Sequence, residues 1–193
     1  MSLKDSILQK AATYADEFIA IRHHLHANPE LSYQEFETSA FIQDFLQKQG
    51  IPFTIMADTG VVGIIEGRNP ASRIIALRAD MDALPIVEAN DVPYKSQNPG
   101  VMHACGHDAH TASLLGAAKI LHEVKDQFEG TIKLIFQPGE EMNPGGASLM
   151  MKAGVLQHPS VEKMYALHVF PEMEVGNIGL RPGLYMASSD ELH

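Results

Sequence analysis

The sequence predicts an α/β fold in which helices cover both faces of a largely parallel, mixed sheet. Segments with apolar residues at helical spacing alternate along the chain with short runs rich in β-branched residues, which are typical of strands buried on both faces. A chain of 193 residues favours one domain over two, and no internal repeat or low-complexity stretch interrupts it. We therefore expect one core built around one sheet.

The two N-terminal helices are predicted from their apolar stripes and their ends. Apolar residues recur at helical spacing from Leu3 to about Ala27, and Asn28-Pro29 ends the pattern. A second helix is expected to begin at Ser32, with Glu35 as its capping-box partner. It should end before Gly50, because glycine is favoured just past a helix end.

Strands and two further helices alternate in the rest of the chain. The predicted strands are residues 61–65, 73–77, 131–136 and 163–169, with residues 176–181 as an edge strand. The predicted helices are residues 111–124 and 147–153. Because each helix carries the chain back across the sheet, this alternation predicts parallel pairing.

Charge and cysteine content argue against some partners and compartments. The chain has 14 basic and 24 acidic residues, so it lacks the excess of positive charge that a nucleic-acid surface needs. Cys105 is the single cysteine, which excludes an intrachain disulfide. We find no targeting signal and no apolar stretch of membrane-spanning length, and we expect a cytoplasmic protein without a membrane partner.

Polar residues that follow predicted strands are candidates for a functional site, since ligands of α/β sheets collect at the carboxyl ends of strands. Asp80 and Asp82 follow one strand, Glu140 and Glu141 follow another, and His168 lies in the last residues of a third. Each has a structural alternative. An aspartate can cap a turn or pair with a nearby arginine, adjacent glutamates can form a solvated corner, and a strand histidine can be a hydrogen-bonded core residue.

The stretch from His103 to His110 is the strongest signal for metal binding. It holds three histidines, Cys105 and Asp108 within eight positions, just before a predicted helix. Cysteine and histidine are good ligands for zinc and other transition metals. A spacing of two residues brings Cys105 and His107 near one point where the backbone is extended or turned.

Other residues of ligand type have a simpler interpretation. His23, His24 and His26 lie at the end of the first predicted helix, where a cationic side chain complements the helix dipole. Met150 and Met151 are predicted to fill the core.

Taken together, these motifs resemble the zinc-peptidase-like amidohydrolases, which include hippurate hydrolases, auxin-conjugate hydrolases and N-acetyl-diaminopimelate deacetylases. The resemblance spans nearly the whole chain, in five motifs that follow one another in order. The motifs are RHHLHANPEL at 22–31, LRADMDALP at 77–85, HACGHDAHT at 103–111, FQPGEE at 136–141 and ALHV at 166–169.

The resemblance implies a role for each matching residue. Four residues match metal ligands in a site for one or two divalent ions (Zn, Mn, Ni or Co): Cys105, His107, Glu141 and His168. Glu140 matches the general base, and Asp82 matches an active-site aspartate that orients a ligand. Three residues match positions with supporting roles: Asp80, Asp108 and His110.

These roles imply a metal-dependent amidohydrolase, deacylase or peptidase whose partner is a small molecule, an N-acyl amino acid or a related conjugate. Glu140 would take a proton from the attacking water and pass it to the departing amine, beside a metal that polarises the amide carbonyl.

The chain departs from the family in its length. After the strand that matches residues 178–181, members insert a lid domain that mediates dimerisation, and then return to the catalytic sheet with a further metal-ligating histidine. We expect residues 1–193 to be the N-terminal part of the catalytic domain, without the lid domain and the C-terminal catalytic segment, and to be inactive alone. The full-length form is expected to be a homodimer.

Two other functions stay open. In a cysteine hydrolase, Cys105 would be the nucleophile and His107 or His110 its base, since a helix N-terminus favours a thiolate. This alternative leaves Glu140, Glu141 and His168 without roles. In a non-catalytic half-domain, the same residues would bind metal without turnover.

Overall fold

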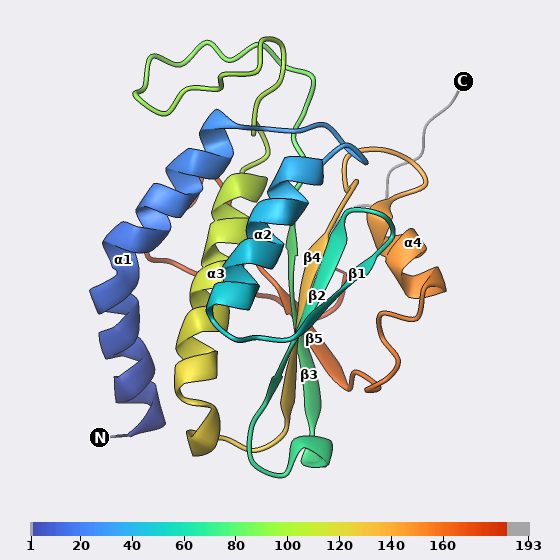
Figure 1. Cartoon of the computed structure of the whole chain (residues 1–193). Helices are drawn as coiled ribbons and strands as arrows, with labels where there is room; N and C mark the ends of the chain where they lie inside the picture. Colours follow the sequence, from blue (N-terminus) through green and yellow to red (C-terminus); the bar gives the residue numbers. More distant parts are fainter. Residues whose placement is uncertain (1, 185–193) are drawn as a thin grey trace.

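The computed structural model describes residues 2–184, which form a mixed five-stranded sheet with helices on both faces (Figure 1). The helices and strands are α1 (Leu3–Ala27), α2 (Phe36–Lys48), β1 (Phe53–Met56), β2 (Gly60–Glu66), β3 (Ile74–Asp80), α3 (His107–Glu123), β4 (Thr131–Gln137), α4 (Gly146–Lys152) and β5 (Lys163–Ala166). Short 3-10 helices cover Pro70–Ser72 and Lys125–Gln127. The predicted fold class is confirmed.

The strands that follow β3 in the sequence lie on opposite sides of it in the sheet. The strand order is β1-β2-β4-β3-β5, with β3 parallel to both β4 and β5. The strands β1 and β2 pair antiparallel with each other, and β2 pairs antiparallel with β4. From β3 the chain crosses through α3 to β4, and then through α4 to β5 on the other side of β3. Such a switch point leaves a crevice beyond the carboxyl end of β3, where ligands bind in this class of sheet.

The core has two parts of unequal size, one on each face of the sheet. On one face, apolar residues of α2 and α3 pack against β2 and β4, among them Leu46, Leu115 and Phe136. The helix α1 packs on α3. On the other face, Met150 of α4 packs with Ile135 and its neighbours. The two opposite crossovers require this arrangement, because right-handed connections place α3 and α4 on opposite faces.

The second helix begins later than predicted, at Phe36, and the capping box is wrong. Ser32 donates its hydroxyl to Asp82, and Glu35 accepts from Thr59 and from the backbone of Gly139. The carboxylate of Glu30 accepts instead from the amides of the first turn of α2, at Glu37 and Thr38. Partners distant in sequence therefore replaced the local cap.

Other element boundaries also differ from the predictions. The helix expected from Thr111 begins at His107, and the strand expected to reach Val169 ends at Ala166. The predicted edge strand at 176–181 is wrong, since those residues pair with no strand in the described part of the chain. The short strand β1 was not predicted.

Two interpretations of single side chains need correction. His26 does not simply complement the dipole of α1: it is buried, with Nδ1 2.8 Å from Asp108 Oδ2 and Nε2 3.0 Å from Glu88 Oε1. Met150 fills the core as predicted, with 1% of its surface exposed, whereas Met151 is 53% exposed.

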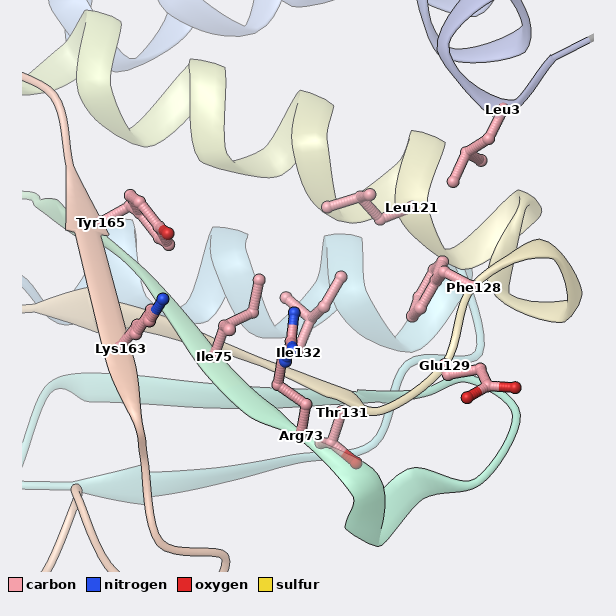
Figure 2. Close-up of a pocket in the computed structure, with 10 residues that line it drawn as sticks. All are labelled: Leu3, Arg73, Ile75, Leu121, Phe128, Glu129, Thr131, Ile132, Lys163 and Tyr165. Atoms are coloured by element: carbon pink, nitrogen blue, oxygen red, sulfur yellow. The ribbon is translucent and has the colours of Figure 1, made fainter.

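The amino ends of the parallel strands lie at the other end of the sheet and have a different character. A cavity of about 320 Å³ opens there between the starts of β3, β4 and β5 and the far end of α3 (Figure 2). Ile75, Leu121 and Phe128 give it an apolar wall, and Arg73 and Lys163 also line it. In residues 2–184, we find no helix with both the length and the apolar character needed to cross a membrane.

Candidate metal centre

The three parallel strands deliver the candidate site residues to one crevice. Asp80 ends β3 and Asp82 follows it, Glu140 and Glu141 follow β4, and His168 follows β5. Carboxyl ends of parallel strands meet at the same edge, so residues up to 88 positions apart become neighbours. The N-terminus of α3 points into the same crevice and adds His107, with Cys105 in the preceding loop.

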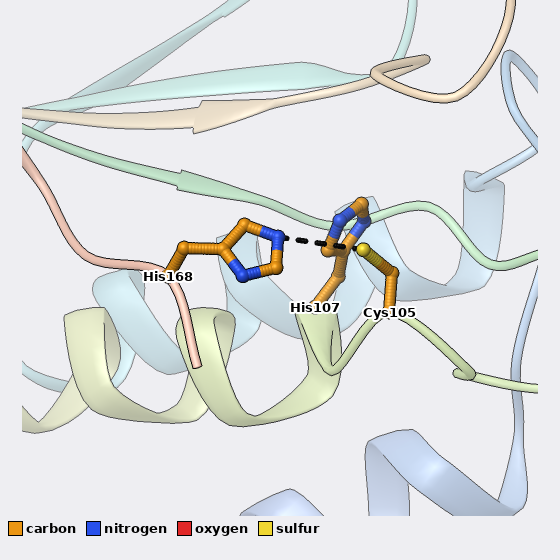
Figure 3. Close-up of side chains that lie close together, drawn as sticks. All are labelled: Cys105, His107 and His168. Atoms are coloured by element: carbon orange, nitrogen blue, oxygen red, sulfur yellow. Dashed lines mark hydrogen bonds between the residues drawn. The ribbon is translucent and has the colours of Figure 1, made fainter. Parts of the chain in front are cut away.

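The other three predicted metal ligands lie around His107. Cys105 Sγ is 3.4 Å from His168 Nε2, and Figure 3 shows both side chains turned toward the His107 ring. One ligand atom from each of Cys105, His107 and His168 lies within 4.8 Å of the others, and the same holds for His107, Glu140 and Glu141. His107 Nε2 is 3.7 Å from Glu141 Oε1. The fold thus brings together every residue that the resemblance assigned as a ligand.

Two buried atoms at the centre have no hydrogen-bond partner in the described structure: His107 Nε2 and Glu141 Oε1. Buried polar atoms are nearly always satisfied, so such a pair needs an explanation. A cation between them would satisfy both. The donor set of thiol sulfur, imidazole nitrogen and carboxylate oxygen is the one that zinc and related transition metals prefer. The residues present therefore fit a divalent metal ion.

Asp82 fixes the orientation of His107. His107 Nδ1 lies 2.8 Å from the backbone oxygen of Asp82 and 3.2 Å from its carboxylate Oδ1. A proton on Nδ1 is held by these acceptors, which leaves Nε2 free to face the other candidate ligands. The second carboxylate oxygen accepts from Ser32 Oγ at 2.6 Å and from the Glu141 amide at 3.0 Å. Burial raises the pKa of Asp82, but the hydrogen bonds from His107 and Ser32 outweigh it and lower the pKa overall.

Asp80 and His110 form a second buried pair behind the ligands. His110 Nδ1 lies 2.6 Å from Asp80 Oδ1, and Arg78 Nη1 donates to the other oxygen at 2.6 Å. Burial raises the pKa of Asp80, but the His110 hydrogen bond and the Arg78 charge outweigh burial and lower the pKa overall. The carboxylate is therefore ionised. His110 Nε2 accepts from the backbone N–H of Val169 at 2.9 Å. The pair therefore ties α3 to the segment that carries His168.

The charges at the centre favour an added cation. Burial and the carboxylate of Glu141 raise the pKa of the Cys105 thiol to about 12. Burial and the same neighbour raise the pKa of Glu140. Burial lowers the pKa of His107, but the Asp82 hydrogen bond and the charges of Asp80 and Glu141 raise it overall. Nearby carboxylates contribute to all three shifts, and a divalent ion would offset their negative charge.

A polar cluster beside the centre was missed by the sequence analysis. Asp108 lies in the first turn of α3, and its Oδ2 is 2.7 Å from Arg22 Nε and 2.8 Å from His26 Nδ1. His26 also contacts Glu88, which accepts from the Ser96 amide at 2.6 Å. Arg22 and His26 are one helical turn apart, and this spacing was the available signal that both face the same partner.

The predicted supporting positions are therefore all in the site's immediate surroundings. Asp80 and His110 join the buried pair, and Asp108 joins the cluster with α1. Asp80 also pairs with Arg78, as one of the structural alternatives had it. Two further residues, Tyr33 and Glu35, hold the loop that carries the glutamates, and no local pattern pointed to that contact.

Comparison with known proteins places these observations in a family. The model of Peptidase family M20/M25/M40 matches residues 76–189. The chain is 44% identical over 188 residues to the N-acyl-L-amino acid amidohydrolase of Geobacillus stearothermophilus, covering 97% of this chain and 50% of that protein. It is 46% identical over 184 residues to IAA-amino acid hydrolase ILR1-like 5 of Arabidopsis thaliana, covering 94% and 41%.

A solved structure agrees with these sequence similarities. The YXEP protein of Bacillus subtilis, described as a dinuclear metal binding peptidase from the M20 family, matches with a TM-score of 0.83 and 41% identity. The match covers 88% of this chain and 47% of that chain. The chain spans about half the length of the curated relatives it matches.

Proposed function

The chain belongs to Peptidase family M20/M25/M40, and from this premise we propose that it forms the N-terminal part of the catalytic domain of a metal-dependent amidohydrolase. The substrate class is an N-acyl amino acid or a related small conjugate, which agrees with the names of the amidohydrolase and conjugate-hydrolase relatives. One observation carries the proposal: Cys105, Glu141 and His168 lie around His107, with Glu140 beside them. Two buried atoms at this centre, His107 Nε2 and Glu141 Oε1, have no hydrogen-bond partner among the described residues.

In this proposal Cys105, His107, Glu141 and His168 hold the metal, and Asp82 orients His107. A bound divalent ion would act as a Lewis acid that polarises the amide carbonyl. The short hydrogen bonds of Asp82 to His107, Ser32 and the Glu141 amide support its role, because they hold two of the four ligands at once.

Glu140 is the proposed general base. Its carboxylate belongs to the group formed with His107 and Glu141, and it is the exposed member, so water and substrate can reach it. Burial of part of the side chain and the neighbouring Glu141 raise its pKa, which brings the carboxylate closer to the range in which a base works near neutral pH. Glu140 then takes a proton from the attacking water and delivers it to the departing amine.

The cysteine-hydrolase alternative is not favoured. A nucleophilic cysteine needs a lowered pKa, whereas burial and Glu141 raise the pKa of Cys105 to about 12. The hydrogen bond of its sulfur joins it to His168, whereas that alternative expected His107 or His110 as the base. The relatives named as amidohydrolases support the metal-dependent reaction instead.

Several finer points belong to the same proposal. We propose one or two ions of Zn, Mn, Ni or Co, of which the donor set favours zinc and related metals. We also propose that the full-length protein carries a lid domain and a C-terminal catalytic segment, that it dimerises through the lid, and that it is cytoplasmic. Length supports the added parts, since the relatives are about twice as long.

The experiment that tests the function is a hydrolysis assay of the full-length protein on a panel of N-acyl amino acids. Released amino acid is measured before and after treatment with a chelator, after restoring Zn²⁺ or Mn²⁺, and after alkylation of thiols. Activity that a chelator removes and a divalent ion restores supports the proposal. Binding of metal with no release from any substrate would favour a non-catalytic role.

A further inference from the structure

The segment between α1 and α2 reaches across the molecule to the loop that carries Glu140 and Glu141. This segment is residues 32–35, and the loop is residues 138–146, from the end of β4 to the first residue of α4. The two lie more than 100 positions apart in the sequence, as the separation of Glu35 from Gly139 shows. The contacts between them fix both ends of the loop and its middle.

Glu35 holds the beginning of the loop. Its carboxylate Oε1 accepts from the Gly139 amide at 2.7 Å, directly before Glu140, and Oε2 accepts from Thr59 Oγ1 at 2.8 Å. Glu35 is 0% exposed, and none of the ion pairs among residues 2–184 includes it. A buried carboxylate without a cation is costly, and burial raises its pKa. Its two hydrogen bonds offset part of this cost, and one of them fixes the Gly139 backbone.

Tyr33 holds the middle and the end of the loop. Its hydroxyl donates to the backbone oxygen of Met142 at 2.7 Å and accepts from the Gly145 amide at 2.9 Å. Its ring lies against Gly139, where an added Cβ would be 2.2 Å from Cε1 of the ring. Tyr33 has a φ of 65° and Gly139 a φ of 53°, so both backbones are in the left-handed region where they meet.

The loop needs these external contacts because its own are few. Gly146 donates to the Gly139 oxygen and Gly145 to the Met142 oxygen, and these two bonds close the loop on itself. Glycines at 139, 145 and 146 give the intervening backbone wide conformational freedom. Between them lie Glu140 and Glu141, whose positions decide the geometry of the proposed base and of one proposed ligand.

We propose that Glu35 and Tyr33 are positioning residues that set the path of the 138–146 loop and so place Glu140 and Glu141 relative to the metal. The inference rests on the function proposed above and adds two residues to it. Among the described residues, neither side chain hydrogen-bonds to a candidate ligand side chain: Glu35 acts through the Gly139 amide, and Tyr33 through Met142 and Gly145. Ser32, in the same segment, contacts Asp82 and ties the segment to the orienting aspartate as well.

The test uses three variants of the full-length protein and one matched control. Tyr33→Phe removes only the hydroxyl, Glu35→Gln keeps an acceptor for the Gly139 amide, and Glu35→Met removes it at similar volume. The control is Tyr14→Phe, which also loses one hydroxyl contact between distant segments, to Glu123 at the far end of α3. The readouts are affinity for Zn²⁺ and Mn²⁺ by competition with a chromophoric chelator, kcat and KM, and thermal unfolding.

We expect Glu35→Met to weaken metal affinity and lower kcat by about 10- to 100-fold, the usual effect of removing a group that orients a metal site. Glu35→Gln should recover most of this loss, Tyr33→Phe should lose several-fold, and Tyr14→Phe should match the wild type. KM should change less than kcat, since the glutamates act in the reaction more than in binding.

A structural role alone predicts a different result. If Glu35→Met and Tyr33→Phe unfold at lower temperature but keep wild-type metal affinity and kcat, the inference is wrong. Should Glu35→Met fail to fold, Tyr33→Phe decides by the same two readouts. A wild-type protein that binds metal but hydrolyses no substrate would contradict the proposed function. The metal affinities of the variants would still test whether Glu35 and Tyr33 position the glutamates.

Discussion

The two walls of the candidate metal centre differ in how the fold holds them. One wall is buried and consists of His107 with Asp82 and Asp80, placed by β3 and the first turn of α3. The other wall consists of His168 and Glu140, which are exposed and lie on segments that follow β5 and β4.

The difference shows which residues serve the fold as well as the site. His107 is fully buried and hydrogen-bonded to Asp82, so its side chain contributes to the core whether or not a metal is present. His168 follows an edge strand, and the backbone N–H of its neighbour Val169 donates to the His110 side chain at Nε2. We infer that the residues of the buried wall take their positions when the domain folds. The residues of the exposed wall contribute little to folding and serve mainly the site.

The largest expected effect on kcat comes from a residue of the exposed wall, and the change should leave stability unaltered. Glu140→Gln should lower kcat by about 10²- to 10⁴-fold, because an amide cannot accept the proton from water. Metal affinity and thermal unfolding should stay near wild type, since the side chain is exposed. Steady-state kinetics with Glu66→Gln, an exposed glutamate at the opposite end of the sheet, is the control. Retention of more than a tenth of wild-type kcat would remove Glu140 as the base.

Substituting one histidine from each wall tests the comparison directly. Both His107→Ala and His168→Ala should abolish tight metal binding. In the metal-free protein, His107→Ala should also lower the free energy of unfolding by about 2–3 kcal/mol, because the buried Asp82 carboxylate loses a partner. His168→Ala should lower it by less than about 0.5 kcal/mol, as for an exposed residue. Urea denaturation measures both, and equal losses would break the distinction between the walls.

Asp82→Asn tests whether orientation within the buried wall matters. The amide offers one oxygen where the carboxylate serves His107, Ser32 and the Glu141 amide. Metal affinity should fall by about 10- to 100-fold. Asp16→Asn, an exposed change on α1, should leave it unaltered. An Asp82→Asn protein that binds Zn²⁺ as the wild type does would show that Asp82 orients no ligand.

The smallest expected effect concerns Glu35, a buried residue that contacts the backbone directly before Glu140 in the exposed wall. Burial raises the pKa of Glu35 above the ordinary value of 4.5, so the folded state favours the protonated form. Its stabilising contribution is complete below that value and is lost as the pH rises through the raised pKa. Glu35→Gln carries no charge at any pH.

The stability difference should therefore depend on pH. The free energy of unfolding of Glu35→Gln relative to wild type should increase from about pH 4.5 upward and level off above the raised pKa. Urea denaturation at several pH values measures it. A difference that is constant with pH would mean that the Glu35 carboxyl has the same pKa in the folded and unfolded states.

Much of the site could be predicted because its residues lie in compact motifs. The block from His103 to His110 and the pair Glu140–Glu141 each follow or precede a strong periodic segment, and the rule for strand ends then brings them together. The prediction that His168 belongs with them depended on the resemblance, since a histidine after an edge strand carries little signal alone.

Other features could not be predicted because their causes are not local. Ser32 and Glu35 fit a capping box, yet their side chains found better partners in Asp82 and Gly139, 50 and 104 positions away. His26 fits the pattern of a helix-end cation, yet it is buried against Asp108, 82 positions away.

The sequence by itself determined the fold class and the order of most helices and strands, because hydrophobic period is a property of short segments. Motif chemistry and the family resemblance together indicated the residues of the candidate centre. Only the tertiary structure decided which polar side chains orient that centre and which wall is buried. The physical reason is that a buried polar group must be hydrogen-bonded, and its partner is whichever group the packing of distant segments brings within reach.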